Sequence, residues 1–334
     1  MNPKTKKTIT ISFDPKTPLI ILALIAAFLA GASWGKRGLV KKTKEGQEGS
    51  EKEHLVEFTP EKQEKTNLKL FVMSFCPFGN QAEIGLKPVA ELLGDKFDFE
   101  PHYIVEKHNQ EQMRQRCQSR VYNEKRCQEY VDQGYFPNLK ACRQRFYTNI
   151  NECLEKEGNN CLLSKDNHYY CSLHGKKELN QNIREICAWN LTEDKNKWWE
   201  FISLVNRNCQ LEEVDSCWQE QAGKAGLDQD KIQQCFNEQA TELLDKEVAL
   251  AAKLAVSGSP TFFINDTPYP PEGAYDREGK MKTKINQEIF SQQEYRSPEA
   301  LKQAICAGFK KAPKECKTEL SRESKMQANR GSCN

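Results

Sequence analysis

The residue best suited to covalent chemistry is Cys76, in the stretch SFCPFGNQAE that runs from Ser74 to Glu83. Pro77 stands where the first residue of a helix would be, a position that proline tolerates. A thiol at a helix N-terminus meets unpaired backbone N–H groups and the positive end of the helix dipole, and both favour the thiolate that attacks disulfides. We therefore expect Cys76 to be the most reactive thiol of the chain. The alternative is a buried structural cysteine at the end of a strand.

The other cysteines indicate the compartment. The chain has 334 residues, 14 cysteines and a net charge of +2, so its charge does not indicate a nucleic-acid partner. Many cysteines are typical of disulfides in an oxidising compartment. A structural zinc site needs cysteines separated by two to four residues, and the sequence contains no such pair. Neither a metal nor a cofactor is expected.

The cysteine spacing leaves the disulfide connectivity open. A ten-residue step on one straight helix separates Cα atoms by about 15 Å, whereas a disulfide needs about 4.4–6.8 Å. A bond between neighbouring cysteines therefore requires a turn, and bonds between different helices are equally possible. Seven to ten residues separate the members of five successive pairs: Cys117/Cys127, Cys142/Cys153, Cys161/Cys171, Cys209/Cys217 and Cys306/Cys316.

The N-terminal region predicts export. Pro18 to Trp34 is an uncharged apolar stretch between lysine-bearing flanks, just long enough to span a membrane. We expect an N-terminal tail over 1–17, a transmembrane anchor over 18–34 and a flexible, Lys/Glu/Gly-rich linker over 35–66. The alternative is a removed signal peptide, since Ala30 to Ala32 fits a cleavage site. Lysines on both flanks leave the orientation unsettled, and the cysteine usage favours a body outside the cytoplasm, in the periplasm, at the cell surface or in a secretory lumen, or secreted.

The apolar pattern predicts strands and helices around Cys76. Asn67 to Phe75 is a dense apolar run typical of a buried strand, and Phe97 to Val105 indicates a second strand after a helix that stops near Gly94. From 106 to 256 the chain becomes polar, cysteine-rich and predominantly helical in pattern. A third strand follows over Thr261 to Asn265, and Ser297-Pro298 begins a last helix.

This order of elements resembles a thioredoxin-fold oxidoreductase of the DsbA-like kind. The resemblance rests on a strand, Cys76-Pro77-Phe78, a helix, a strand, a long helical insertion, Gly258-Ser259-Pro260-Thr261 and a further strand. It implies an α/β thioredoxin-like domain over 67–105 and 257–312, a disulfide-rich helical insertion over 106–256 and a C-terminal tail over 313–334. It also implies a cis Pro260 that faces Cys76, these two being the catalytic residues. The implied substrate-binding residues are Pro77, Phe78, Ser259 and Thr261.

A second stretch narrows the resemblance. CSLHGKKELNQNIREIC, from Cys171 to Cys187, resembles the signature of the gamma-interferon-inducible lysosomal thiol reductases, with one extra residue after Cys171 and with Leu179 where the family has a cysteine. Cys171 and Cys187 are interpreted as structural disulfide partners of the insertion, and His174 as an ordinary polar residue. The matching positions are Cys171, His174, Gly175, Glu178, Asn182 and Cys187.

Gly79 departs from both resemblances, because thioredoxins and these reductases carry a second cysteine at this spacing. That second thiol resolves a mixed disulfide within the same chain. Without it, a disulfide between Cys76 and a substrate has to be resolved by the substrate's own second thiol or by a small thiol, as in monothiol glutaredoxins. The competing interpretation is that redox turnover has been lost and the fold serves for binding.

The remaining cysteines are expected to be structural. Most of those from Cys117 to Cys235 should bond within the insertion, which has too few large apolar residues for burial to hold its helices. At least one of them is expected to stay free or to pair outside. Cys306 should pair with Cys316, because Pro313 stops the helix and lets the chain turn back. Cys333, near a polar C-terminus, is expected to stay unpaired.

The sequence thus predicts a membrane-tethered, extracytoplasmic thiol–disulfide oxidoreductase or isomerase-like protein that acts through Cys76. Its partners would be disulfide- or thiol-containing proteins, and a small thiol would resolve the intermediate. One alternative is a redox-inactive module that binds extended peptides as a strand beside the Pro260 loop. Another is a disulfide-stapled helical interaction domain on an incidental thioredoxin scaffold.

Overall fold

The computed structural model describes residues 55–275 and 279–324. The predicted N-terminal tail and anchor lie outside these residues. Among the helices that are described, none has the length and apolar character to cross a membrane.

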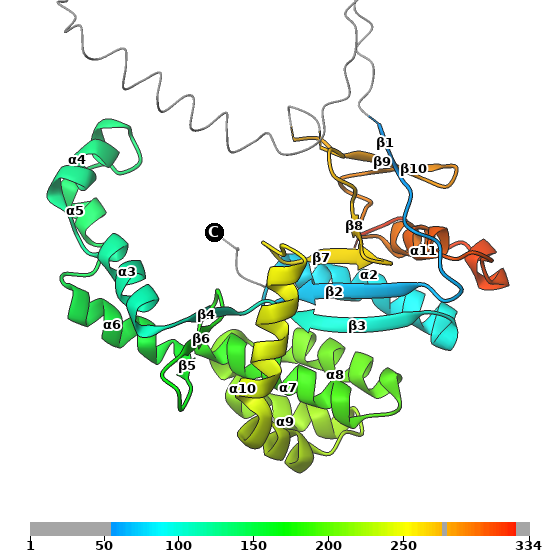
Figure 1. Cartoon of the computed structure of the whole chain (residues 1–334), viewed down its shortest axis with the longest axis horizontal. Helices are drawn as coiled ribbons and strands as arrows, with labels where there is room; N and C mark the ends of the chain where they lie inside the picture. The colour runs from blue at the N-terminus through cyan, green and yellow to red at the C-terminus, as the bar shows by residue number, and fades with distance from the viewer. Residues whose placement is uncertain (1–54, 276–278, 325–334) are drawn as a thin grey trace, which may run out of the picture. The chain divides into compact units, whose positions relative to one another are not determined.

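A four-stranded sheet with the order β3-β2-β7-β8 forms the centre of the fold. β2 (Asn67–Val72) is parallel to β3 (Asp98–Tyr103), while β7 (Thr261–Ile264) is antiparallel to β2 and to β8 (Thr267–Tyr269). This strand order, with one helix joining the parallel pair and another after the hairpin, is a thioredoxin-like fold (Figure 1).

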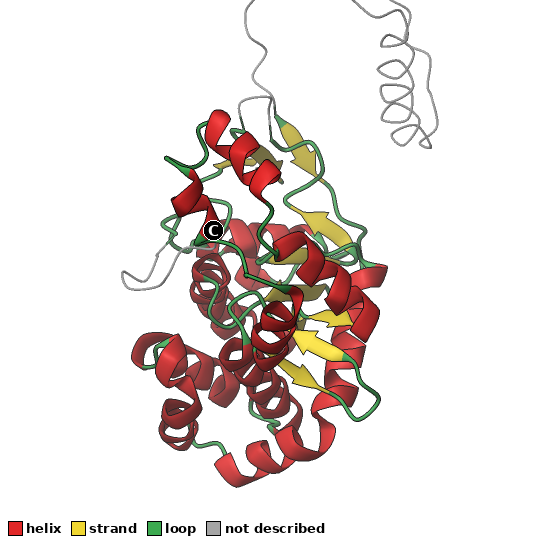
Figure 2. Cartoon of the chain, turned by 90° about the vertical axis from the view of Figure 1, so that its left-hand side faces the viewer, coloured by secondary structure: helices red, strands yellow, loops and turns green. Residues whose placement is uncertain are grey.

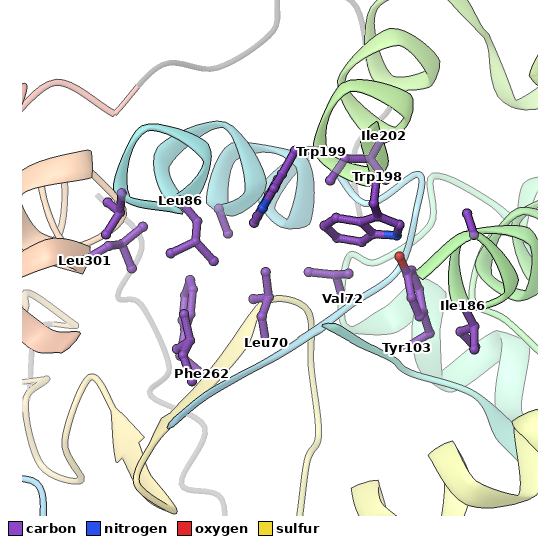
Figure 3. Close-up of a cluster of buried hydrophobic side chains, with 14 of the residues drawn as sticks. Leu70, Val72, Leu86, Tyr103, Ile186, Trp198, Trp199, Ile202, Phe262 and Leu301 are labelled. Carbon is purple, nitrogen blue, oxygen red and sulfur yellow. The ribbon is translucent and has the colours of Figure 1, made fainter. Parts of the chain in front are cut away.

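Successive side chains of β2 point to opposite faces of the sheet, and helices cover both faces (Figure 2). Leu70 and Val72 lie on the face of the sheet covered by α2 (Pro77–Leu93) and α11 (Pro298–Ala307). Leu70 is directed toward Leu86 of α2, with Leu301 of α11 beyond it, and Val72 lies beneath Trp198 (Figure 3). The opposite face carries Phe71, which packs with Phe263 and with Ala251 of α10 (Gln229–Lys253). The helix that begins at Cys76 and the long helix before Pro260 therefore lie on opposite faces.

The first half of the insertion has almost no apolar core. Its helices are α3 (Gln110–Arg120), α4 (Glu124–Asp132), α5 (Leu139–Arg143) and α6 (Ile150–Asn159). The only residues that they bury are Met113, four cysteines and Glu157. An asparagine side chain caps the N-terminus of each helix. Caps and disulfides, more than apolar burial, hold these helices.

The second half of the insertion has a real core, contrary to the prediction of sparse apolar burial. α7 (Lys176–Leu191), α8 (Lys195–Asn208) and α9 (Val214–Lys224) join α10 around Trp198, Trp199 and Trp218, all almost fully buried. These aromatic residues are few but large, so counting apolar positions underestimated what they bury. The insertion also contains a small sheet that the sequence pattern did not predict. It consists of β4 (Glu106–His108), β6 (Tyr169–Cys171) and β5 (Cys161–Leu163).

Two predicted boundaries are wrong. β1 (Val56–Phe58) pairs with β9 (Lys282–Ile285), which also pairs with β10 (Glu288–Ser291). Phe58 is 2% exposed, so residues 55–66 belong to the folded body and not to a flexible linker. The predicted tail is also attached to the body as far as Arg322, because Glu299 accepts from the Leu320 N–H and Arg322 pairs with Glu288 and Glu294.

Six disulfides join twelve of the thirteen described cysteines. Cys306 pairs with Cys316, as the sequence predicted. The ten cysteines from Cys117 to Cys235 all bond within the insertion. The expectation that at least one of them stays free or pairs outside is wrong, because five disulfides use all ten. Cys333 lies outside the described residues. The insertion disulfides are Cys117–Cys153, Cys127–Cys142, Cys161–Cys171, Cys187–Cys235 and Cys209–Cys217.

Candidate active site at Cys76

Cys76 is the N-cap residue of α2. Its backbone is extended (φ −72°, ψ 120°), and Pro77 is the first helical residue. The Cys76 N–H donates to the Met73 carbonyl at 3.0 Å, and the Cys76 carbonyl accepts from the Asn80 N–H at 2.9 Å. Among the described cysteines only Cys76 keeps its thiol, and the residue is 1% exposed.

The Pro260 loop meets the thiol directly. The Ser259–Pro260 peptide is cis, and the Cys76 thiol lies 3.6 Å from the carbonyl oxygen of Ser259. β2 and β7 are hydrogen-bonded neighbours that run in opposite directions. The C-terminal end of β2 and the N-terminal end of β7 therefore lie side by side at one end of these two strands. The structure therefore brings together Cys76 and Pro260, which are separated by the whole insertion in the sequence.

Ser259 also occupies the space beside Gly79. Its Oγ accepts a hydrogen bond from the Met73 N–H at 3.2 Å. A Cβ atom added at residue 79 would lie 2.8 Å from this Oγ and 3.3 Å from the Met73 carbonyl oxygen. Unstrained Cβ atoms do not come so close, so a second thiol at residue 79 requires Ser259 to move.

The remaining predicted substrate-binding residues flank the thiol. Phe78 is 41% exposed, and the guanidinium of Arg296 lies 5.1 Å from the centre of its ring. Pro77 and Thr261 are half-buried, and the Thr261 hydroxyl donates to the Gly258 carbonyl at 2.6 Å. An exposed aromatic ring thus stands two residues from a buried thiol. Sequence reasoning missed Arg296, because nothing in its local pattern places it beside α2.

Side chains of α7 support the loop before Cys76. Glu178 Oε1 accepts from the Phe75 N–H at 3.0 Å, and Asn182 Oδ1 accepts from the Ser74 N–H at 3.0 Å. Both residues are 0% exposed. They belong to the stretch that resembles the lysosomal thiol reductases, but sequence reasoning assigned them no role.

A second carboxylate, that of Glu185, extends this buried polar network. Glu185 Oε2 lies 3.0 Å from the Ser74 hydroxyl and accepts a hydrogen bond from the Tyr103 hydroxyl at 2.7 Å. Burial raises the pKa of Tyr103 well above its usual value, and the carboxylates of Glu185 and Glu83 raise it further. Tyr103 therefore stays a neutral donor over the physiological pH range.

His174 takes part in the same network. A hydrogen bond between its Nδ1 and Glu178 Oε1, at 2.7 Å, raises the pKa of His174. The ring therefore contacts a carboxylate that supports the loop, and the interpretation of His174 as an ordinary polar residue stays a prediction. In the described part of the chain, no group of three or more His, Cys, Asp or Glu residues is arranged to hold a metal ion.

Comparison with known proteins shows that part of this chain is similar to the vacuolar sorting receptors. The sequence profile of the vacuolar sorting receptor thioredoxin-like domain matches residues 134–285. Vacuolar-sorting receptor 5 of Arabidopsis thaliana is 23% identical over 174 residues, 48% of this chain and 24% of the receptor. Vacuolar-sorting receptor 6 of the same plant is 23% identical over 181 residues, 49% of this chain and 25% of the receptor. The match spans about a quarter of these relatives' length, and the profile match begins after Cys76.

Solved structures of disulfide oxidoreductases are among the distant matches to this chain. The disulfide bond oxidoreductase DsbG from Mycobacterium tuberculosis has a TM-score of 0.38 at 15% identity, over 78% of this chain and 88% of DsbG. The cytosolic disulfide reductase DsbM from Pseudomonas aeruginosa has a TM-score of 0.34 at 12% identity, over 71% of this chain and 95% of DsbM. The thioredoxin-like assignment rests on the strand order and its connections, and these likenesses add no argument to it.

Proposed function

We propose that this protein is an extracytoplasmic thiol–disulfide oxidoreductase or isomerase-like protein that acts through the single thiol of Cys76. The observation that carries the proposal is the 3.6 Å approach of the Cys76 thiol to the Ser259 carbonyl, at the N-terminus of α2. The helix N-terminus favours the thiolate. The likeness of the Cys171–Cys187 stretch to the lysosomal thiol reductases also supports thiol chemistry.

The reaction is thiol–disulfide exchange in two steps. The Cys76 thiolate attacks one sulfur of a substrate disulfide, so that a Cys76–substrate bond forms and the other substrate sulfur leaves as a thiolate. In the second step a thiol attacks the substrate sulfur of the mixed disulfide, and the Cys76 thiolate leaves. If that thiol is the substrate's own, a substrate disulfide forms again with the same or a different partner. If it is a small thiol, it stays bonded to the substrate until a second small thiol attacks its sulfur; the substrate thiolate then leaves, so the substrate disulfide is reduced and the two small thiols are oxidised to their disulfide.

The partners and the location are part of the proposal. Disulfide- or thiol-containing proteins are the proposed substrates, and residues 18–34 are proposed to tether the body outside the cytoplasm. Six disulfides support an oxidising compartment, because reducing systems in the cytosol remove such bonds.

The test is thiol titration of the purified full chain in a Cys333→Ser background, with 5,5′-dithiobis(2-nitrobenzoic acid) as the probe disulfide. The native protein should release one equivalent of thionitrobenzoate, and Cys76→Ser should abolish the release. A cyclic disulfide peptide should then give a mixed disulfide with Cys76, seen by mass spectrometry. A thiol that reacts only after unfolding in guanidinium would contradict the proposal.

A second candidate function is a redox-inactive module that binds extended peptides beside the Pro260 loop. Two observations favour it: Cys76 is almost completely buried, and Ser259 occupies the space where a resolving thiol would stand. The match to a receptor domain is a further argument for binding. Under this alternative, peptide binding survives Cys76→Ser unchanged and no mixed disulfide forms.

A further inference from the structure

One helix of the insertion reaches the segment that presents Cys76. α7 places Glu178 at the Phe75 peptide and Asn182 at the Ser74 peptide. Residues four apart lie on the same face of a helix, so a single face of α7 contacts two consecutive peptide groups. The insertion is therefore in direct contact with the loop beside the thiol.

The carboxylate of Glu178 joins two loops. Its Oε1 accepts from the Phe75 N–H at 3.0 Å and lies 2.7 Å from His174 Nδ1. Its Oε2 accepts from the Ser172 hydroxyl at 2.7 Å and from the His174 N–H at 3.1 Å. Burying a carboxylate costs free energy unless hydrogen bonds replace those it made with water. Hydrogen bonds to a charged acceptor are among the strong ones, and Glu178 has four partners of this kind.

Helix capping does not account for this arrangement. Gly175 is the N-cap residue of α7 with φ 88°, a left-handed conformation that favours glycine, and it offers no side chain to the helix. Glu178, three residues later, reaches back to the N–H of His174, one residue before the N-cap, whereas a capping box would use the N–H of the N-cap itself. That contact uses only Oε2. Oε1 is directed at Phe75, 103 residues earlier in the chain.

We propose that Glu178 is a positioning residue for Cys76: by fixing the Phe75 peptide, its carboxylate holds the thiol in line with the Ser259 carbonyl and Pro260. The inference rests on the proposed function, because the direction of the thiol matters for chemistry only if Cys76 reacts. Disulfide exchange requires the attacking sulfur to approach in a defined direction, and a small misplacement slows such a reaction strongly. The insertion then contributes to the reaction by holding the nucleophile.

The chain offers a matched control in Glu247 of α10. Its Oε2 accepts from the Tyr103 N–H at 3.0 Å and lies 3.2 Å from His102 Nδ1. Like Glu178, it is a buried carboxylate that joins a backbone N–H to a histidine ring, but it holds β3 and not the Cys76 loop. Loss of either carboxylate should destabilise the fold, and only loss of Glu178 should change the chemistry.

The experiment compares Glu178→Ala, Glu178→Gln and Glu247→Ala in the full chain with Cys333→Ser. The rate of thionitrobenzoate release is measured well below the unfolding midpoint of each variant. We expect Glu178→Ala to slow the reaction at least tenfold. Glu178→Gln keeps an oxygen for the Phe75 N–H and should stay within threefold of the parent, and Glu247→Ala should leave the rate unchanged. Hydrogen exchange at the Phe75 amide should become faster in Glu178→Ala and stay slow in Glu247→Ala.

Three results would overturn the inference: an unchanged rate in Glu178→Ala, an equal loss in Glu247→Ala, or a Phe75 amide that stays protected when Glu178 is removed. A parent protein whose native thiol does not react contradicts the proposed function instead. In that case the exchange of the Phe75 amide still decides whether Glu178 fixes this loop.

Discussion

The hydroxyl of Ser259 lies where a side chain on residue 79 would have to stand, 2.8 Å from the position of its Cβ. The missing second thiol is therefore accompanied by a serine that uses the space and hydrogen-bonds to the Met73 N–H. Gly79 and Ser259 depend on each other, although they lie far apart in the sequence. A side chain at residue 79 therefore requires the Ser259 hydroxyl to move away, which costs its hydrogen bond from the Met73 N–H.

We predict that a working two-cysteine motif requires two substitutions. Gly79→Cys alone should lower the free energy of unfolding by about 1–3 kcal/mol, because it overpacks the loop. Gly79→Cys with Ser259→Ala should relieve this contact, let Cys76 form a disulfide with the introduced thiol and shorten the lifetime of mixed disulfides. Urea denaturation and quenched non-reducing gels measure the two effects, with Ser259→Ala as the control. A Gly79→Cys variant that is fully stable and forms the disulfide unaided would contradict this view.

The second prediction concerns Asn182 below the Cys76 loop. Asn182→Ala removes the acceptor of the Ser74 N–H in a fully buried position. The expected loss is about 1–3 kcal/mol in the free energy of unfolding, the usual cost of removing a buried partner. Asn180→Ala on the same helix is the control, because its amide reaches only a partly exposed Asp215 at 3.2 Å. If urea denaturation gave the same loss of unfolding free energy for Asn182→Ala and Asn180→Ala, the buried hydrogen bond to the Ser74 N–H would not contribute to stability.

The sequence predicted the thioredoxin-like core because the signals there are local. The apolar run before Cys76, Pro77 at the start of the helix and the aromatic strand after Pro260 each indicate one element. The resemblance then placed Pro260 near Cys76, and the structure has these loops in contact. Pairing of Cys306 with Cys316 was predictable for the same reason, since a proline forces a turn between them.

The contacts around the site could not be predicted, because they join distant segments. Nothing near Glu178 indicates that its carboxylate receives the Phe75 N–H, and nothing near Ser259 indicates that its hydroxyl stands against Gly79. The packing of Phe58 and Arg322 was missed because both lie in polar segments whose composition predicts no core of their own. Their order comes from the surface on which they pack, and composition does not reveal that surface.

The third prediction separates the two halves of the insertion. Cys127→Ala with Cys142→Ala removes a disulfide between residues 15 apart in the sequence. Its loss should lower the free energy of unfolding of α4 and α5 by about 3 kcal/mol. These helices have almost no apolar burial, so we expect amide exchange across residues 124–143 to become fast while residues 176–253 stay protected. Cys187→Ala with Cys235→Ala is the comparison, because Trp198 and Trp218 still hold those helices. Cooperative unfolding of the whole body after loss of the first bond would contradict this division.

The last prediction is a dependence of stability on pH that comes from His102 at the edge of the sheet. Burial lowers the pKa of this ring, but hydrogen bonds with the carboxylates of Glu100 and Glu247 outweigh it and raise the pKa to about 9. A histidine whose pKa is raised in the folded state stabilises the fold fully below its unfolded pKa of about 6.5, and this contribution is lost as the pH rises toward 9.

The free energy of unfolding should therefore fall by up to about 3 kcal/mol between pH 6 and pH 9 from this residue. His102→Gln cannot take up the proton and should remove this part of the pH dependence, so the difference between the two proteins should be large at pH 6 and small at pH 9. Urea denaturation at several pH values measures it, and stopping at pH 9 avoids the titration of tyrosines in the unfolded chain. Parallel curves for the two proteins would mean that the carboxylates hold the neutral ring, and that His102 contributes only its packing on Phe71 at 4.9 Å between ring centres.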